Sequence, residues 1–202
     1  MNTNQIFKTW TLNQSLGLIL GWFFHSIISH LWTGDHEYTM NGPQFIMHNV
    51  SLLGCAIIYL YFVNRATQTL FNISITKNWI LYLIIPTGLF WVGFLLKAVP
   101  LDVLLWFLSV GFFNGVFLTR HLQLKTNQWI IWSTLSALIG FMAGVIVLIP
   151  LDSYLTSLKG LTAHIIMFTL LGIVAGIPMA LFGGIMLKKT MIKNQIQETG
   201  IS

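Results

Sequence analysis

Charged side chains are scarce in this sequence. Ten basic and five acidic residues make up 7% of its 202 residues, whereas soluble domains carry about 25%. A water-soluble fold could not cover its surface with so few charges, so a soluble enzyme and a disordered chain are both excluded. Cysteine is scarcer still. Cys55 is the single one, so the chain forms no internal disulfide and is not a secreted disulfide scaffold.

Hydrophobic residues are abundant instead, at 55% of the chain and a mean hydropathy of +0.78. A helix crosses the hydrocarbon core with about 20 apolar residues, because each backbone group then finds its hydrogen bond within the segment. Six stretches qualify: 15–32, 46–63, 79–96, 103–119, 129–149 and 161–187. Runs such as 81–85 do not alternate polar and apolar residues, as a membrane strand would. The sequence therefore predicts an all-α, polytopic membrane protein with one domain over residues 1–202.

The basic residues are distributed unevenly over the predicted connections. If the N-terminus is cytoplasmic, that side receives eight of the ten: Lys8, Arg65, Lys77, Arg120, Lys125, Lys188, Lys189 and Lys193. The other side receives Lys97 and Lys159, with the acids Asp35, Glu37, Asp102 and Asp152. The positive-inside rule thus predicts a cell-membrane protein with both termini in the cytoplasm. Trp10, Trp79 and Trp129 are then expected at the cytoplasmic interface, with each indole N–H in water.

Two short motifs recur at an offset of fifty positions. Asn-Trp-Ile at 78–80 matches Gln-Trp-Ile at 128–130, and Val-Pro-Leu-Asp at 99–102 matches Ile-Pro-Leu-Asp at 149–152. This repeat predicts three helical hairpins, at about 10–65, 78–120 and 128–189. Each Pro-Leu-Asp is expected to form an outer turn, in which Asp102 or Asp152 caps the returning helix rather than acting as a catalytic acid.

Small and amide residues within the spans are expected to hold the helices together. Four pairs of glycines are spaced four residues apart: Gly17 with Gly21, Gly111 with Gly115, Gly140 with Gly144, and Gly172 with Gly176. Such pairs let two helix backbones approach closely, and packing within the chain is favoured over a homodimer seam. The amides of Asn13, Gln14 and Asn114 are expected to form hydrogen bonds between helices.

Two segments carry a resemblance to known sequences. Residues 10–21 read W-T-L-N-Q-S-L-G-L-I-L-G, and residues 118–122 read L-T-R-H-L before Trp129. They resemble the W-x-L-x-x-x-L-G-x-x-x-G and L-x-R-H-L segments of a group of uncharacterised bacterial multi-pass membrane proteins. The chain departs from that group at Asn13, Gln14 and Thr119. The resemblance implies a helical membrane fold and no particular chemistry.

No predicted span has a charged residue at its middle, where ion-coupled transporters usually keep one. Histidines are therefore the main remaining candidates for a functional site. His30, His48 and His164 lie near the outer ends of the first, second and sixth predicted helices, and Asp35, His36 and Glu37 lie in the adjoining loop. Imidazole and carboxylate groups are ligands of zinc, nickel and copper(II), so these six residues form a candidate transition-metal site. Haem is the alternative cofactor. A plain structural role is also open, because no H-x-x-x-H or C-x-x-C spacing is present.

Three functions follow from these features. The favoured one is a non-enzymatic accessory or small-solute-binding or transport module, acting with a partner membrane subunit or as a homo-oligomer. The second is transition-metal or haem binding by the outer histidines. The third is a lipid-active enzyme of the outer leaflet, although no G-x-S-x-G motif is present. Nucleic acid is not expected as a partner, because the basic residues form no clustered run before Lys188, Lys189 and Lys193 near the C-terminus.

Overall fold

The computed structural model describes residues 3–33, 42–72, 101–121, 127–157 and 160–199, together with Ile85 and Gly88. Over these residues the chain is helical and contains no strand, so the all-α class is confirmed for this part of the protein. The helices are α1 (Thr3–Thr33), α2 (Gly42–Phe71), α4 (Leu101–His121), α5 (Gln128–Ser157) and α6 (Gly160–Thr199). Apart from Ile85 and Gly88, the predicted third helix at 79–96 lies outside the described residues.

Two asparagines mark helix ends. Asn72 adopts a left-handed backbone conformation, with φ at 55°, and its N–H donates to the carbonyl of Gln68 at 3.0 Å. Asparagine tolerates this conformation better than most residues, so it ends α2 at Phe71. At the start of α5, the carbonyl of Asn127 accepts a hydrogen bond from the N–H of Ile130 at 3.0 Å. This bond forms the first turn of α5.

The two C-terminal helices run past their predicted ends. Pro150 lies inside α5, which continues to Ser157, so the outer turn predicted at residues 150–152 is wrong. Asp152 lies within the same helix rather than at the start of the returning one. A proline inside a helix removes one backbone hydrogen bond, a loss that membrane helices often tolerate because neighbouring groups compensate for it. Helix α6 similarly contains Pro178 and extends to Thr199.

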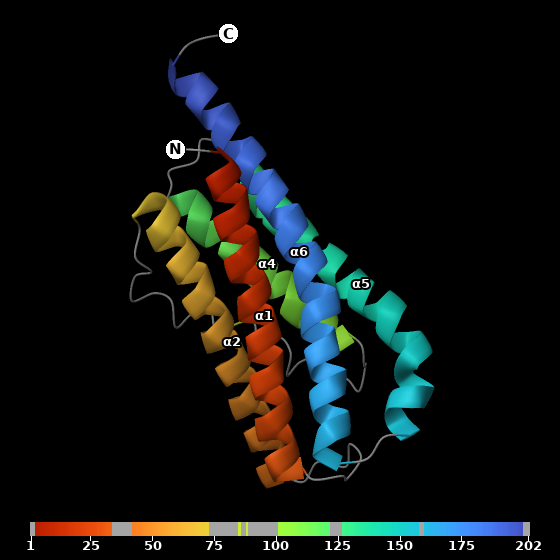
Figure 1. The fold of residues 1–202 in the computed structure, drawn as a ribbon. Coiled ribbons are helices and arrows are strands. Elements are labelled where there is room, and N and C mark those ends of the chain that lie inside the picture. Colours follow the sequence, from red (N-terminus) through yellow and green to blue (C-terminus); the bar gives the residue numbers. More distant parts are fainter. Residues whose placement is uncertain are drawn as a thin grey trace.

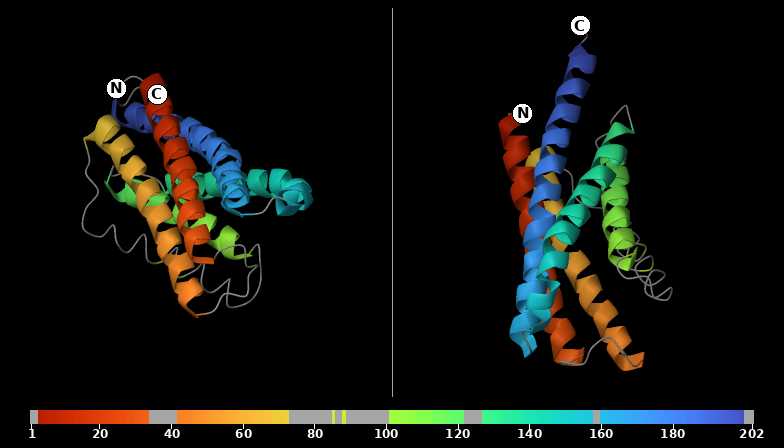
Figure 2. Two further views of the ribbon diagram at one scale, coloured as in Figure 1. Left: turned by 60° about the horizontal axis from the view of Figure 1, so that its bottom comes forward. Right: turned by 90° about the vertical axis from the view of Figure 1, so that its right-hand side faces the viewer.

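The helices pack side by side in the order α2, α1, α6, α5, α4, because α1 contacts both α2 and α6, and α5 contacts both α6 and α4. Figure 1 and Figure 2 show that α1 and α5 run in one direction and that α2, α4 and α6 run in the other. The start of α1 and the C-terminal part of α6 therefore lie at the same end of the bundle. There, the Lys188 ammonium donates to Asn4 Oδ1 at 2.9 Å.

Glycines lie where neighbouring helices approach most closely. A Cβ atom on Gly111 of α4 would lie 2.7 Å from the carbonyl oxygen of Ser133 on α5. A Cβ atom on Gly140 of α5 would lie 2.6 Å from the carbonyl oxygen of Ala175 on α6. Real Cβ atoms do not approach this closely, so only glycine permits these helix pairs to pack at this distance.

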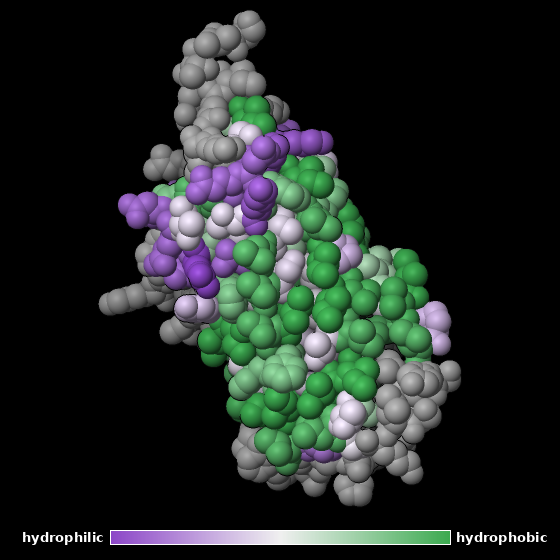
Figure 3. Space-filling model, in the orientation of Figure 1, coloured by the Kyte–Doolittle hydropathy of each residue, from purple (hydrophilic) through white to green (hydrophobic). Residues whose placement is uncertain are grey.

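Much of the outer surface is apolar. Exposed side chains follow one face of α5 at steps of three or four residues: Ile131, Leu135, Ile139, Met142, Ile146 and Ile149. Figure 3 shows apolar residues over the body of the bundle and hydrophilic ones gathered towards the end where α1 begins. Within the described ranges, three helical segments are long and apolar enough to cross a membrane: Val50–Phe71, Gln128–Leu151 and Gly160–Ile192. Soluble monomers rarely expose an apolar surface this continuous, which indicates a membrane protein.

Candidate functional site

Large aromatic rings fill the middle of the bundle. Trp22 on α1 stacks on Phe168 of α6, with ring centroids 5.8 Å apart and planes 2° from parallel. It also stacks on Phe107 of α4 at 6.4 Å and meets the neighbouring Trp106 edge-on at 5.5 Å. We call Trp22, Trp106, Phe107 and Phe168 the aromatic layer. It bridges α1 and α4, which are not neighbours in the helix order.

A histidine and a serine are buried on the far side of this layer from the N-terminus. His25 lies one turn beyond Trp22 on α1, and its Nδ1 lies 2.8 Å from Oγ of Ser51 on α2. The His25 ring also meets Phe168 edge-on at 4.8 Å. Both polar residues are almost completely buried. The pair therefore links α1 to α2 inside the bundle rather than facing solvent.

A group of polar atoms converges around Gly183 on the other side of the aromatic layer. A Cβ atom on Gly183 of α6 would have three polar atoms as its nearest neighbours: Trp10 Nε1 at 3.4 Å, Ser136 Oγ at 3.6 Å and Gln14 Oε1 at 3.7 Å. Two of these residues belong to α1 and one to α5. We call Trp10, Gln14, Ser136 and Gly183 the polar site. Trp10 and Trp22 are twelve positions apart along α1, a distance of about 18 Å in a helix.

Two atoms of the polar site have no hydrogen-bond partner among the described residues. Trp10 Nε1 and Gln14 Oε1 are both buried and unpaired. Burying a polar group without a partner costs about 1–3 kcal/mol. Folded proteins contain few such groups, and each one calls for a structural explanation. Their convergence on one point makes this part of the bundle the strongest candidate for a binding site.

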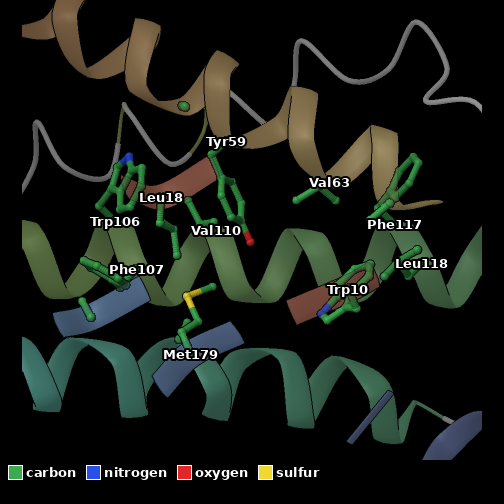
Figure 4. Packing of buried hydrophobic residues seen from close by; sticks show 14 of the residues in the cluster. Trp10, Leu18, Tyr59, Val63, Trp106, Phe107, Val110, Phe117, Leu118 and Met179 are labelled. Atoms are coloured by element: carbon green, nitrogen blue, oxygen red, sulfur yellow. The ribbon is translucent and has the colours of Figure 1, made fainter. Parts of the chain in front are cut away.

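Further unpaired polar atoms lie in the same interior. Trp129 Nε1, Asn114 Oδ1 and the Tyr59 hydroxyl are buried, again with no partner in the described part of the chain. The Trp129 ring meets the Trp10 ring edge-on at 5.9 Å. Tyr59 of α2 and Val110 of α4 belong to the same cluster of buried residues, and Figure 4 shows the Tyr59 ring extending from α2 into the bundle. Asn114 is four residues from Val110 and shares its face of α4. Polar groups from four helices thus face the interior between the aromatic layer and the N-terminal end.

These positions correct two predictions. Trp10 and Trp129 were expected to keep their indole N–H groups in water, but both side chains are buried and their nitrogens are enclosed. The amides were expected to bond between helices. Instead, Asn13 Nδ2 donates to the carbonyl of Thr9 in its own helix, and the side-chain oxygens of Gln14 and Asn114 are unpaired. The spacing of Trp10 and Gln14 was the available signal, since residues four apart share one helix face.

The predicted metal ligands fall only partly within the described structure. His30 lies on α1 and is half-buried. His48 lies on α2 and His164 on α6, but their side chains, like the whole of residues 35–37, lie outside the described part. Among the side chains that are described, no three His, Cys, Asp or Glu residues could hold one metal ion. Helix α1 does pack against both α2 and α6, as this site would require. Metal binding by Asp35, His36, Glu37 and these three histidines stays a prediction.

Comparison with known proteins assigns neither a family nor a function to the chain. No protein-family model, curated protein or solved structure matches the chain. The resemblance to bacterial multi-pass membrane proteins therefore stays a prediction, and functional inference depends on the geometry of the interior.

Proposed function

We propose that the chain is a cell-membrane protein of six transmembrane helices, arranged as three hairpins with both termini in the cytoplasm. The apolar surface and the three long apolar helices support the membrane location. The common end of α1 and α6 supports placing both termini on one side (Figure 1). The exposed basic side chains of Lys8, Arg65, Arg120 and Lys189 match the cytoplasmic side that the sequence predicts.

The direction of the helices supports a sixth crossing. Helix α2 ends at the same end of the bundle at which α1 begins, whereas α4 begins further towards the other end and runs in the same direction as α2 (Figure 1). The 28 residues from 73 to 100 join the end of α2 to the start of α4. As a helix, 28 residues span about 42 Å, which is enough to cross a bilayer.

Reporter fusions test this topology. Alkaline phosphatase becomes active only outside the cytoplasm, and green fluorescent protein reports cytoplasmic ends. We expect phosphatase activity from a fusion after Leu158, and fluorescence without phosphatase activity from fusions after Lys125 and Ser202. Phosphatase activity from the fusion after Lys125 would contradict the six-helix arrangement.

We further propose that the protein is a non-enzymatic module that binds a small solute inside the bundle. The observation that carries this proposal is the convergence of the buried, unpaired atoms Trp10 Nε1 and Gln14 Oε1, with Ser136 Oγ, on the point beside Gly183. A solute with matching hydrogen-bonding groups would satisfy atoms that are otherwise costly to bury. The site lies on the N-terminal side of the aromatic layer, so access from the cytoplasm is expected.

Chemical accessibility of Ser136 tests whether small molecules reach the site. In a background with Cys55→Ala, the Ser136→Cys variant is treated with methyl methanethiosulfonate, a small neutral thiol reagent, in membrane vesicles. We expect modification of this cysteine, detected by mass spectrometry. Ser26→Cys is the matched control, because both serines are buried and both donate to the carbonyl three residues before them. Ser26 lies beyond the aromatic layer and should react at least tenfold more slowly.

Equal reaction at the two positions would show that the reagent does not distinguish the polar site from the rest of the interior. No reaction at Ser136→Cys, while a cysteine introduced at exposed Thr69 reacts fully, would overturn solute entry. Either result would remove the support for a binding module.

A further inference from the structure

The space beside Gly183 is small and is bounded by polar atoms. The nearest atom to a Cβ at this position would be Trp10 Nε1, at 3.4 Å. At this ordinary van der Waals separation a methyl group bonded to Gly183 would fit, so the space between Gly183 and the three polar atoms is small. Any ligand that pairs with these atoms therefore does so through a small terminal group, with the rest of the molecule lying further out.

The polar atoms require both a donor and an acceptor from that terminal group. The Trp10 indole N–H can only donate, and Gln14 Oε1 can only accept. The Ser136 hydroxyl donates its proton to the carbonyl of Ser133 at 2.7 Å, so its oxygen is left as an acceptor. A hydroxyl group satisfies this set, because it accepts from Trp10 and donates to Gln14 or Ser136. A halide or carboxylate would face two acceptor oxygens, and an ammonium could not accept from the indole.

The surroundings also favour an uncharged ligand. Among the side chains described by the structure, Lys8, Arg65, Arg120 and Lys189 are exposed, and Lys188 is half-exposed beside Asn4. None of them is buried at the polar site. A charge buried without a counter-charge is far more costly than a neutral hydrogen-bonding group.

We propose that the polar site binds the hydroxyl group of a small neutral alcohol or polyol, an inference that rests on the proposed solute-binding function. The hydroxyl oxygen accepts a hydrogen bond from Trp10 Nε1–H and donates one to Gln14 Oε1 or Ser136 Oγ. Such a ligand reaches the site either from water, as a polyol, or from the bilayer, as an apolar alcohol.

Indole NMR tests this proposal directly. The protein is labelled with ¹⁵N-indole tryptophan and purified in lauryldimethylamine oxide, a detergent without hydroxyl groups. The Trp10 signal is assigned with Trp10→Phe. Glycerol represents the water-soluble source and 1-hexanol the membrane source, while 1-chlorohexane, methylammonium and formate lack a hydroxyl group. We expect a saturable shift of the Trp10 signal with at least one hydroxyl probe and with none of the other three.

Two glycine variants provide the matched comparison. Gly183→Ala places a methyl group in the space beside Trp10 at ordinary contact distance, so the fold should tolerate it. We expect binding of the hydroxyl probe to weaken about tenfold or more, as loss of one or two hydrogen bonds implies. Gly144→Ala makes the same change on α5, where the nearest atom is the flexible end of Leu171, and should leave binding unchanged.

The possible outcomes separate the inference from the proposed function. A saturable shift with glycerol alone assigns a polyol from water, and a shift with 1-hexanol alone assigns an alcohol from the bilayer. If a probe without a hydroxyl group binds at least as tightly, the hydroxyl inference is overturned while solute binding stands. If the Trp10 signal does not respond to any probe, the hydroxyl inference is also overturned, and reaction of Ser136→Cys then decides separately whether solutes enter the bundle.

Discussion

Ser51 on α2 and His25 on α1 form a hydrogen bond inside the bundle, with 2.8 Å between Ser51 Oγ and His25 Nδ1. Both residues are almost completely buried, so water cannot replace either partner. The bond lies next to the close backbone contact at Gly21, where a Cβ would be 2.9 Å from the carbonyl oxygen of Cys55. Polar pairing and close packing thus act together at the α1–α2 contact.

A double-mutant cycle on His25 and Ser51 should give a favourable coupling free energy. We expect about 1 kcal/mol, because hydrogen bonds between membrane helices typically contribute about 0.6 and at most about 1.7 kcal/mol. The variants are His25→Ala, Ser51→Ala and their combination, compared by reversible unfolding in mixed micelles. Thr69→Ala is a suitable control, since the hydroxyl of exposed Thr69 donates to the carbonyl of Arg65 in its own helix. Additive effects of the two substitutions would contradict an energetic role for the bond.

Gly140 and Gly144 should respond differently to alanine although they belong to one pair. A Cβ on Gly140 would lie 2.6 Å from a backbone oxygen of Ala175, whereas one on Gly144 would lie 3.1 Å from the mobile end of Leu171. We expect Gly140→Ala to lower the free energy of unfolding by about 1–3 kcal/mol, the usual cost of overpacking. Gly144→Ala should change it by less than about 0.5 kcal/mol. Equal effects in the same unfolding assay would show that α5 and α6 adjust their separation freely.

Trp22 should be the most costly residue of the aromatic layer to truncate. Trp22→Ala removes a ring that contacts both α4 and α6. In the same unfolding assay, we expect the free energy of unfolding to fall by about 3–5 kcal/mol, as for other buried aromatic residues. Trp22→Phe should recover much of this loss. The neighbouring Phe23 is 38% exposed, so Phe23→Ala serves as the control and should cost much less. Similar losses at Trp22 and Phe23 would show that the layer does not hold the helices together.

The all-helical class and the approximate positions of the helices could be predicted from the sequence, because long apolar runs leave few alternatives to a helix. The residues at which the helices end were harder to predict. Pro150 was expected to form a turn, but the apolar residues that surround it continue to favour the helix, which extends to Ser157. In soluble proteins proline often marks the end of a helix. It does so less reliably in a membrane helix, where packing compensates for the missing hydrogen bond.

The polar site could not be predicted because it depends on tertiary packing. Trp10 and Trp129 have the sequence positions of interfacial tryptophans, yet their rings meet inside the bundle at 5.9 Å. Nothing in the sequence places Gly183 of α6 opposite Gln14 of α1, more than 160 residues away. The helix order α2, α1, α6, α5, α4 brings them together, and that order is set by side-chain packing and by glycine contacts.

The outer histidines provide the last prediction, because α1 is the helix on which both α2 and α6 pack. If His30, His48 and His164 hold a transition metal with Asp35, His36 or Glu37, protein purified without a histidine tag should contain about one equivalent of metal. Replacing the three histidines by alanine should remove it, and haem would instead appear as an intense absorption band near 400 nm. His121→Ala is the control, since His121 lies on α4 and bonds to the carbonyl of Phe117. Metal-free and haem-free protein in every form would leave these histidines with a structural role, as hydrogen-bonding residues at the membrane interface.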